Sequence, residues 1–386
     1  MGKSPLFSIF LVVFLDLVGF GVVIPILPYY SQEFGATGST LGWLMATYSI
    51  TQFIFSPFWG SVSDRRGRRP VLLSTILGGS LAMAATAYAP SLGFLFLARA
   101  LAGFFGANIS TASAYIADIT SPESRAKGMG VIGAGFGLGF IFGPAIGGVL
   151  SRWGYPVPIL AASGLGLLNF ALAFLTLKEP SEKTGTRRKL SWNLAREGLA
   201  TRATAAPILL FFLGTLAFTQ LEVTFALFVQ SRFHLGAPQA GGLLAAMGLV
   251  MAAIQGGAIG GLARRFGEQK LVPLGQITIA AGVLAAAWSP ALAFFAGALL
   301  LVAVGNAVVN PSLSSLASKG APADRQGEIL GVYQSAGSLS RIVGPPLAGY
   351  LFDHAGIASP LLLTSFLCAM AALASVRWLN PSHELS

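Results

Sequence analysis

The sequence predicts an all-α integral membrane protein in which 12 transmembrane helices form two pseudo-symmetric six-helix bundles. Three observations predict this fold class. First, 54% of the 386 residues are hydrophobic and only 10% are charged, a composition that would hardly keep a protein of this length soluble in water. Second, loops separate the long apolar stretches, and every second loop is rich in basic residues while the others are poor in them. Third, motifs of the first half recur in the second half.

The expected spans follow from the helix length that a bilayer requires. A hydrocarbon core of about 30 Å takes about 20 helical residues. Twelve stretches meet this length, at residues 7–30, 41–62, 71–89, 93–118, 127–150, 156–177, 206–231, 239–262, 271–288, 291–316, 326–350 and 357–379. The first stretch has no small-residue cleavage site at its end, so we interpret it as a retained span and not as a signal peptide.

The distribution of Lys and Arg assigns a side of the membrane to each loop. An even number of spans places both termini and every second loop on one side, and these segments hold 20 of the 24 basic residues. Arg152 and Arg232 lie on the opposite side, and Arg99 and Arg341 lie inside spans. The positive-inside rule therefore predicts a multi-pass protein of the cell inner (plasma) membrane with both termini in the cytoplasm. Because the basic residues form no single face, the net charge of +10 does not indicate a nucleic-acid partner.

An internal repeat divides the chain into two halves. Gly60, Arg65 and Gly67 recur 200 residues later as Gly260, Arg265 and Gly267. Since six spans separate the copies, the halves share one orientation and are related by an axis along the membrane normal. We expect an N-terminal bundle over residues 1–177, a basic cytoplasmic linker over 178–205 and a C-terminal bundle over 206–386. The linker either lies along the membrane interface as a helix or forms a disordered tether.

Four segments carry a resemblance to a known family. Residues 16–28 read DLVGFGVVIPILP, residues 60–69 read GSVSDRRGRR, residues 99–103 read RALAG and residues 139–148 read GFIFGPAIGG. They resemble the signatures of the major facilitator superfamily, specifically its twelve-helix drug:proton antiporter branch, which includes the tetracycline-resistance exporters. The resemblance covers nearly the whole chain, and the last segment is the one that favours antiport.

The resemblance also implies roles for marked residues. It implies a conformational latch at the cytoplasmic ends of spans 2 and 4, formed by Gly60, Asp64, Arg65, Gly67, Arg68 and Asp118. It assigns Arg99 to a proton relay. The second copy of the loop departs from the pattern, because Arg264 stands where Asp64 stands in the first copy, so we expect that half to lack the acidic latch.

Ionisable side chains inside the spans are the expected proton-coupling residues. Asp16 and Asn108 fall at about the same depth in spans 1 and 4, and Glu222 and Arg341 fall at about the same depth in spans 7 and 11. Charges deep in a membrane are costly and by default mark a transport path. We expect Asp16, Glu222, Arg341 and Arg99 to couple protons. The structural alternatives stay open: Asp16 pins helices together, Glu222 and Arg341 form a permanent ion pair, and Arg99 is a snorkelling anchor.

Spans 1, 4, 7 and 10 are expected to enclose a midplane cavity. Its expected lining residues are Asn108, Gln220, Phe20, Phe104, Phe218 and Phe225. Aromatic rings with few polar groups suit an amphipathic or cationic organic substrate.

The glycines of span 5 are expected to form part of the interface between the two bundles. The residues at this expected interface are Gly139, Gly143, Pro144, Gly147 and Gly148. Their three- and four-residue spacing leaves a smooth helix face on which another helix can pack closely.

The sequence argues against other function classes. It has no phosphate-binding Gly-Lys-Ser/Thr loop, no nucleophile and base cluster, and neither cysteines nor histidines at metal-ligand spacing. We therefore expect no enzyme, no cofactor and no bound metal. The partners are expected to be a small-molecule substrate, protons and the lipid bilayer, with monomeric function implied by the family.

The function that we expect is proton-coupled antiport that exports small amphipathic or cationic organic compounds by alternating access. The first alternative is a proton symporter or facilitator of a sugar or other metabolite. The second is a non-transporting membrane sensor.

Overall fold

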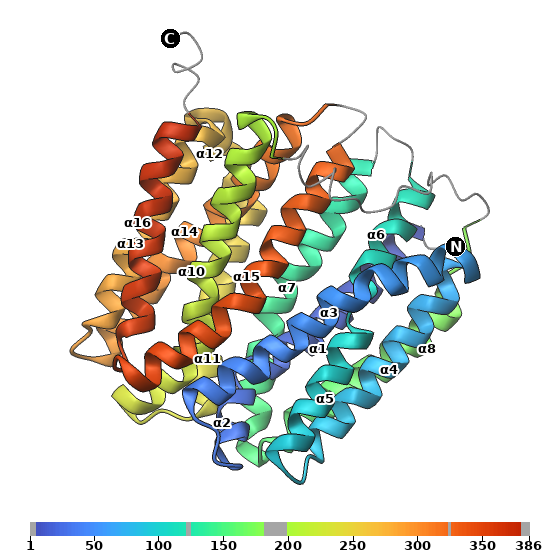
Figure 1. Ribbon diagram of the computed structural model, residues 1–386, viewed down its shortest axis with the longest axis horizontal. Coiled ribbons are helices and arrows are strands. Elements are labelled where there is room, and N and C mark those ends of the chain that lie inside the picture. The colour runs from blue at the N-terminus through green and yellow to red at the C-terminus, as the bar shows by residue number, and fades with distance from the viewer. Residues whose placement is uncertain (1–4, 121–124, 181–198, 323–325, 380–386) are drawn as a thin grey trace. The chain divides into compact units, whose positions relative to one another are not determined.

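The computed structural model describes residues 5–120, 125–180, 199–322 and 326–379, and every regular element in these ranges is helical (Figure 1). The first part of the chain forms α1 (Pro5–Val23), α2 (Leu27–Gln32), α3 (Gly38–Arg66), α4 (Arg68–Ala87), α5 (Leu92–Phe105), α6 (Asn108–Ile119), α7 (Arg125–Leu150), the short η1 (Ser151–Trp153) and α8 (Pro156–Thr176). Most of the expected linker, residues 181–198, lies outside the described residues.

The second part of the chain is helical in the same way. It forms α10 (Arg202–Phe233), α11 (Ala237–Ala253), the π-helical turn η2 (Ile254–Ala258), α12 (Ile259–Phe266), α13 (Glu268–Ala287), α14 (Leu292–Lys319), α15 (Gln326–His354) and α16 (Ser359–Trp378).

Helices coincide with each of the twelve expected spans. In the described ranges, eight helical stretches are long and apolar enough to cross a membrane: Leu6–Val23, Arg68–Ala87, Pro156–Thr176, Arg202–Phe233, Ala237–Phe266, Glu268–Ala287, Leu292–Lys319 and Ser359–Trp378. The other four expected spans coincide with α3, with α5 followed by α6, with α7 and with α15. The predicted all-helical membrane fold is confirmed.

Two expected spans are interrupted, which the apolar pattern did not predict. Span 1 breaks between α1 and α2, where Pro25 has no N–H to donate to the carbonyl of Gly21. Span 4 breaks after Phe105, where the side-chain amide of Gln52 donates a 2.8 Å hydrogen bond to the carbonyl of Gly106. A side chain that occupies a helical carbonyl in this way competes with the i→i+4 ladder and bends the helix.

The helices form two compact units. Unit 1 comprises Met1–Ala36, Leu44–Lys189 and Leu235–Ala245, and in it α1 packs on α7 and α8, while α4 packs on α5 and α8. A buried cluster of this unit consists of Ile9, Val12, Val13, Leu17, Leu72, Ile76, Ala112, Tyr115, Ile116, Ala173 and Leu177.

Unit 2 comprises Thr37–Trp43, Leu190–His234 and Ala246–Ser386. In it, α13 packs on α14 and α16, and α10 packs on α15 and α16.

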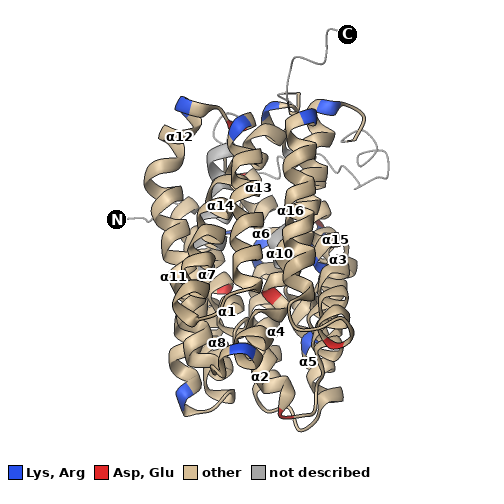
Figure 2. Cartoon of the chain, turned by 90° about the vertical axis from the view of Figure 1, so that its left-hand side faces the viewer, with Lys and Arg blue, Asp and Glu red and all other residues tan. Residues whose placement is uncertain are grey.

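The outer faces of the helices are apolar, as a lipid environment requires. Leu175 is 80% exposed and Leu373 is 67% exposed, and many other large apolar side chains are exposed along the helices. Figure 2 shows helices that are mostly free of charge along their length, with Lys and Arg gathered near helix ends. Such extended apolar exposure is unfavourable in water and is satisfied by contact with lipid tails.

Three of the span 5 glycines bring α7 close to α1. A Cβ on Gly143 would lie 2.5 Å from the backbone of Gly21, and a Cβ on Gly147 would lie 2.4 Å from the carbonyl of Val22. A Cβ on Gly139 would lie 2.8 Å from the backbone of Leu17. These three glycines therefore let α7 approach α1 within unit 1. The expected role of span 5 at the interface between bundles stays a prediction.

The two remaining residues at the expected interface meet α11. A Cβ on Gly241 would lie 2.7 Å from the carbonyl of Pro144 and 2.6 Å from Cα of Gly148. Gly241 belongs to the sequence range expected for the second bundle, but the structure groups residues 235–245 with unit 1.

Candidate functional site

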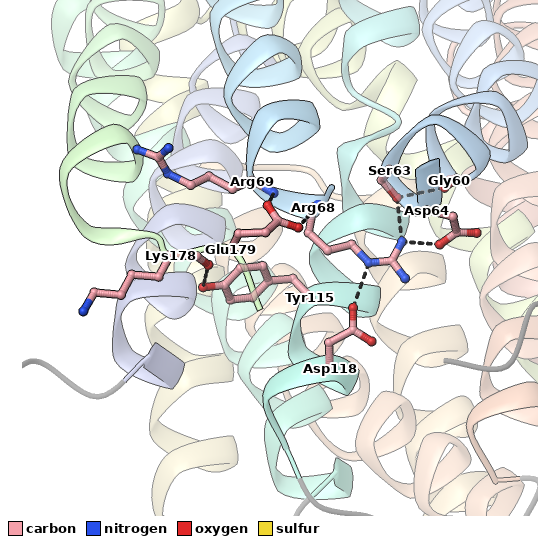
Figure 3. A network of polar contacts seen from close by, with 9 residues as sticks. All are labelled: Gly60, Ser63, Asp64, Arg68, Arg69, Tyr115, Asp118, Lys178 and Glu179. Carbon is pink, nitrogen blue, oxygen red and sulfur yellow. Dashed lines mark hydrogen bonds and ion pairs between the residues drawn. The ribbon is translucent and has the colours of Figure 1, made fainter. Parts of the chain in front are cut away.

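A network centred on Arg68 occupies the end of unit 1 where α3 ends and α4 begins (Figure 3). Its Nε donates a 2.9 Å hydrogen bond to Oδ2 of Asp118, and its Nη1 donates to Oγ of Ser63 at 2.7 Å and to Oδ1 of Asp64. The Arg68 and Asp118 side chains are 8% and 2% exposed, whereas that of Asp64 is 43% exposed. The buried charge of Arg68 is therefore balanced mainly by Asp118, and Asp64 stays accessible.

A glutamate that sequence analysis did not identify completes this network. Oε1 of Glu179 accepts a 2.7 Å hydrogen bond from the backbone N–H of Arg68, and Oε2 accepts a 2.9 Å hydrogen bond from that of Arg69. These amides belong to the first turn of α4 and have no partner within the helix, so Glu179 acts as a cap that comes from a distant part of the chain. The sequence shows only that Glu179 follows α8, and no local spacing indicates that its carboxylate contacts α4.

Local backbone geometry explains why the loop has this form. Gly67 has φ of 104°, a conformation that L side chains rarely adopt, and it separates α3 from α4. A Cβ on Gly67 would also lie 2.8 Å from Oε1 of Glu179. The glycine therefore permits both the turn and the cap.

The remaining expected latch residues lie beside the network. The carbonyl of Gly60 accepts a hydrogen bond from Oγ of Ser63, and Arg65 is exposed. The structure thus brings Asp64, Arg68 and Asp118 into direct contact within unit 1. Their role as a conformational latch stays a prediction.

Arg99 forms a second cluster in unit 1. Its side chain is buried, and its guanidinium carbon lies 4.7 Å from the ring centroid of Tyr48. The ring of Phe20 lies 5.4 Å from that of Tyr48, so α1, α3 and α5 meet at this point. Within the described part of the chain, Nε and Nη1 of Arg99 make no hydrogen bond with the protein. A buried guanidinium in this state can donate hydrogen bonds to an anionic group or a carbonyl oxygen.

Gly103 on α5 and Gln52 on α3 each contribute a close contact at this cluster. A Cβ on Gly103 would lie 2.1 Å from Oγ1 of Thr51 and 2.3 Å from the carbonyl of Tyr48, so only glycine lets α5 approach α3 this closely. Nε2 of Gln52 lies 3.3 Å from the hydroxyl of Tyr48. Neither Tyr48 nor Gln52 was identified from the sequence, because each is a single polar residue on a long helix without a motif.

Aromatic side chains near α5 pack on one another. Phe104 lies 4.7 Å from Phe55 and 5.2 Å from Trp59, and the carbonyl of Phe104 accepts a 2.7 Å hydrogen bond from the Trp59 indole. Phe104 is partly buried, so part of its ring remains accessible.

In unit 2, Glu222 of α10 and Arg341 of α15 lie close enough for their charges to attract each other. The two helices are joined nearby by side chains. Nε2 of Gln220 donates a 3.1 Å hydrogen bond to the carbonyl of Gly344, and Oγ of Ser340 donates a 2.8 Å hydrogen bond to that of Phe212. Two residues that the sequence places at equal depth in spans 7 and 11 thus lie near each other, and their role in proton coupling stays a prediction.

The other expected cavity residues differ in exposure. Phe218 is partly buried, whereas Gln220 is fully buried and Phe225 is 2% exposed and stacked on Phe295 of α14. Asp16 is partly buried in α1. Asn108 is the first residue of α6, and its side chain lies outside the described residues. In the described ranges, no three His, Cys, Asp or Glu side chains gather as a metal site would require.

Comparisons with known proteins agree on one family. The sequence model of the Major Facilitator Superfamily matches residues 9–345 and 258–385. Tetracycline resistance protein, class C, of Escherichia coli is 33% identical over 343 residues, which cover 86% of this chain and 85% of the relative. Multidrug resistance protein 2 of Bacillus subtilis (strain 168) is 28% identical over 383 residues, with coverage of 96% and 94%. The crystal structure of the human organic anion transporter MFSD10 (TETRAN) matches with a TM-score of 0.71 at 26% identity, covering 97% of this chain and 100% of that one.

Proposed function

Because the chain belongs to the Major Facilitator Superfamily, and is thus a multi-pass membrane transporter and not an enzyme, we propose that it exports small amphipathic or cationic organic compounds in exchange for protons. The observation that carries this proposal is the presence of the carboxylates Asp16 and Glu222 within apolar helices that cross the membrane. A carboxylate in that position is costly unless it binds a proton, a cation or a substrate during the cycle. The likeness to the tetracycline and multidrug resistance proteins supports efflux over uptake.

In this proposal the Glu222 carboxylate alternates between Arg341 and a proton. Protonation of Glu222 removes the charge that attracts Arg341, so it weakens the attraction between α10 and α15. Asp16 in α1 is the second titrating group. Binding of substrate near Phe20 and Phe104 of unit 1 then favours release of the proton, which couples the two flows.

The Arg68 network is proposed to act at the cytoplasmic end of unit 1. It holds the ends of α3, α4 and α6 as one block, because Arg68 contacts both Asp64 and Asp118 and Glu179 caps α4. The accessible carboxylate of Asp64 is the group of this block that can form and break a contact as the transporter opens and closes. With both termini in the cytoplasm of the inner membrane, this end opens toward the cytoplasm.

One observation favours a second candidate, export of organic anions. Nε and Nη1 of buried Arg99 are without protein partners in the described part of the chain, and a carboxylate of a substrate would satisfy them. The matched human structure is described as an organic anion transporter, which supports the same candidate. Substitution of Arg99 by Lys would reduce transport of anions but not of cations if this candidate holds.

Transport driven by an imposed pH gradient tests the proposal. In proteoliposomes with the cytoplasmic face outward and an acidic lumen, antiport predicts accumulation of a radiolabelled amphiphile such as tetracycline, and an ionophore that dissipates the gradient abolishes it. A symporter would instead accumulate its substrate when the outside is acidic. A facilitator would equilibrate it under either gradient. Equal uptake by liposomes with and without the protein, for amphiphiles, anions and sugars, would contradict a transport function with these substrates.

A further inference from the structure

An open cavity of ≈ 530 Å³ lies at the end of unit 2 where α10 begins and α16 ends. Its lining residues are Arg202, Ala205, Ala206, Leu209, Arg377 and Trp378. None of them takes part in the transport path proposed above. Both helices belong to unit 2 and pack on each other, so the cavity lies within one compact unit.

The cavity presents two positive charges at a helix end that is itself suited to anions. The guanidinium of Arg202 donates hydrogen bonds from Nε to the carbonyl of Trp378, at 3.3 Å, and from Nη2 to that of Arg377. These bonds fix Arg202 over the last turn of α16 and satisfy carbonyls that have no helical partner. The Arg377 side chain is exposed, and the N-terminal amides of α10 add a partial positive charge. The two arginines that line the cavity therefore attract an anionic group to it.

The apolar part of each helix continues directly from these charges. On α10, Arg202, Ala205, Ala206 and Leu209 have the spacing of one helix face, and Leu209 is 41% exposed. On α16, Arg377 shares a face with Leu373, Met370 and Phe366, at intervals of four, three and four residues.

The α16 side chains of this face are well exposed. Leu373 is 67% exposed, Met370 is 46% exposed and Phe366 is 60% exposed. The arrangement is therefore a basic group at the water interface followed by an apolar stripe that runs toward the middle of the membrane. A free phosphate ion would contact only the basic part, whereas a phospholipid contacts both parts.

We propose that this cavity binds the headgroup of an anionic glycerophospholipid, whose phosphate lies between Arg202 and Arg377 and whose acyl chains lie along the exposed stripe of α16. Trp378 is 37% exposed at the same level, where indole rings favour the boundary between headgroups and hydrocarbon. Basic cavities between transmembrane helices at the membrane surface are suited to such headgroups.

Titration of the purified, delipidated protein with phosphatidylglycerol and with phosphatidylcholine, followed by native mass spectrometry, tests this site. The wild type is expected to bind phosphatidylglycerol more tightly. Each arginine near the surface contributes roughly fivefold in affinity, so Arg202→Gln with Arg377→Gln should weaken phosphatidylglycerol binding by roughly 30-fold and leave phosphatidylcholine binding unchanged. The double substitution to Lys should retain most of the preference.

A matched variant separates this site from general surface charge. Arg264→Gln with Arg265→Gln removes two exposed arginines at the end of α12, also in unit 2, and should retain the preference. Because Arg202 also caps α16, the single variant Arg377→Gln provides a test without loss of that cap, with an expected fivefold effect.

Three outcomes would overturn the proposal. Both double variants could lose the preference equally, which would indicate unspecific attraction. The wild type could bind both lipids equally. Millimolar inorganic phosphate could displace phosphatidylglycerol, which would indicate a site for a free anion.

Discussion

The Nε atom of Arg68 lies 2.9 Å from Oδ2 of Asp118, and the Asp118 side chain is only 2% exposed. Arg68 also contacts Ser63 and Asp64, so one guanidinium joins the end of α3 to the end of α6. Removal of either member of a buried ion pair leaves the other charged group desolvated without compensation. The pair therefore provides a direct test of what holds α3, α4 and α6 together at this end of unit 1.

Substitution Arg68→Ala is expected to destabilise the protein by about 3–5 kcal/mol, because Asp118 loses its buried counter-charge. Thermal unfolding of the purified protein in detergent measures the change. Arg65→Ala is the matched control, since Arg65 is exposed in the same loop and should change stability by less than about 0.5 kcal/mol. Equal stability of the two variants would show that the Arg68 network contributes nothing.

Substitution Glu179→Ala is expected to release the first turn of α4. The amides of Arg68 and Arg69 lose their acceptor, which costs about 1–2 kcal/mol locally. Hydrogen exchange followed by mass spectrometry should show faster exchange in peptides that begin α4. Lys178→Ala serves as the control, since its side chain is exposed and its backbone carbonyl still accepts from Tyr115. Unchanged exchange in the Glu179 variant would refute the cap.

Substitution Gly103→Ala is expected to push α5 away from α3 and to separate Arg99 from Tyr48. The added methyl group meets the backbone carbonyl of Tyr48, which cannot rotate away, so the cost is about 1–3 kcal/mol. Gly93→Ala lies in the same helix with nothing within 4 Å of the added Cβ, and should be neutral or stabilising by up to about 1 kcal/mol. A melting temperature for the Gly103 variant that matches that of the Gly93 variant would contradict this packing.

Asp353 provides a pH-dependent contact in unit 2. Its carboxylate lies beyond residue 350, where the expected span ends, and accepts hydrogen bonds from the backbone amides of Gly38 and Ser39 and from the Ser39 hydroxyl. Partial burial alone would raise the pKa of Asp353, but the hydrogen bonds from Ser39, Gly38 and Thr37 outweigh it and hold the pKa below its ordinary value.

The stability that Asp353 contributes to the folded protein depends on pH, because its pKa differs between the folded and unfolded states. Because the pKa of Asp353 is lower in the folded state, its carboxylate stabilises the protein fully when the pH is above the unfolded-state pKa of about 3.9. This stabilisation is lost as the pH falls through the folded-state pKa. The difference in melting temperature between the wild type and Asp353→Asn should thus be constant near neutral pH and should shrink below about pH 4. A difference that grows on acidification would mean that the pKa is raised.

The helical membrane fold and the depth of charged residues in the spans could be predicted from the sequence, because they depend on helix length and rise alone. Counting residues placed Glu222 and Arg341 at one depth, and in the structure they lie near each other. The ends of spans 2 and 4 were expected to hold Asp64, Arg68 and Asp118, and these three side chains are in contact.

Contacts that depend on helix rotation or on distant backbone could not be predicted. Glu179 caps α4 only because α8 returns to the same end of unit 1, and Gln52 bends span 4 only because α3 crosses it at Gly106. The glycines of span 5 signal close packing in any context, and the sequence does not state whether the partner is α1 or a helix of the other bundle. The spacing of the glycines therefore identified the face of α7 that packs closely, but not the helix that packs against it.

Proton release on substrate binding tests the central claim most directly. A pH dye reports protons released when an amphiphilic substrate is added to the purified protein in weak buffer. We predict release by the wild type and by the control Glu33→Gln, whose exposed carboxylate lies outside the spans, and loss of release in Asp16→Asn or Glu222→Gln. Substrate-induced release that persists at the wild-type level in both variants would contradict coupling through these intramembrane carboxylates.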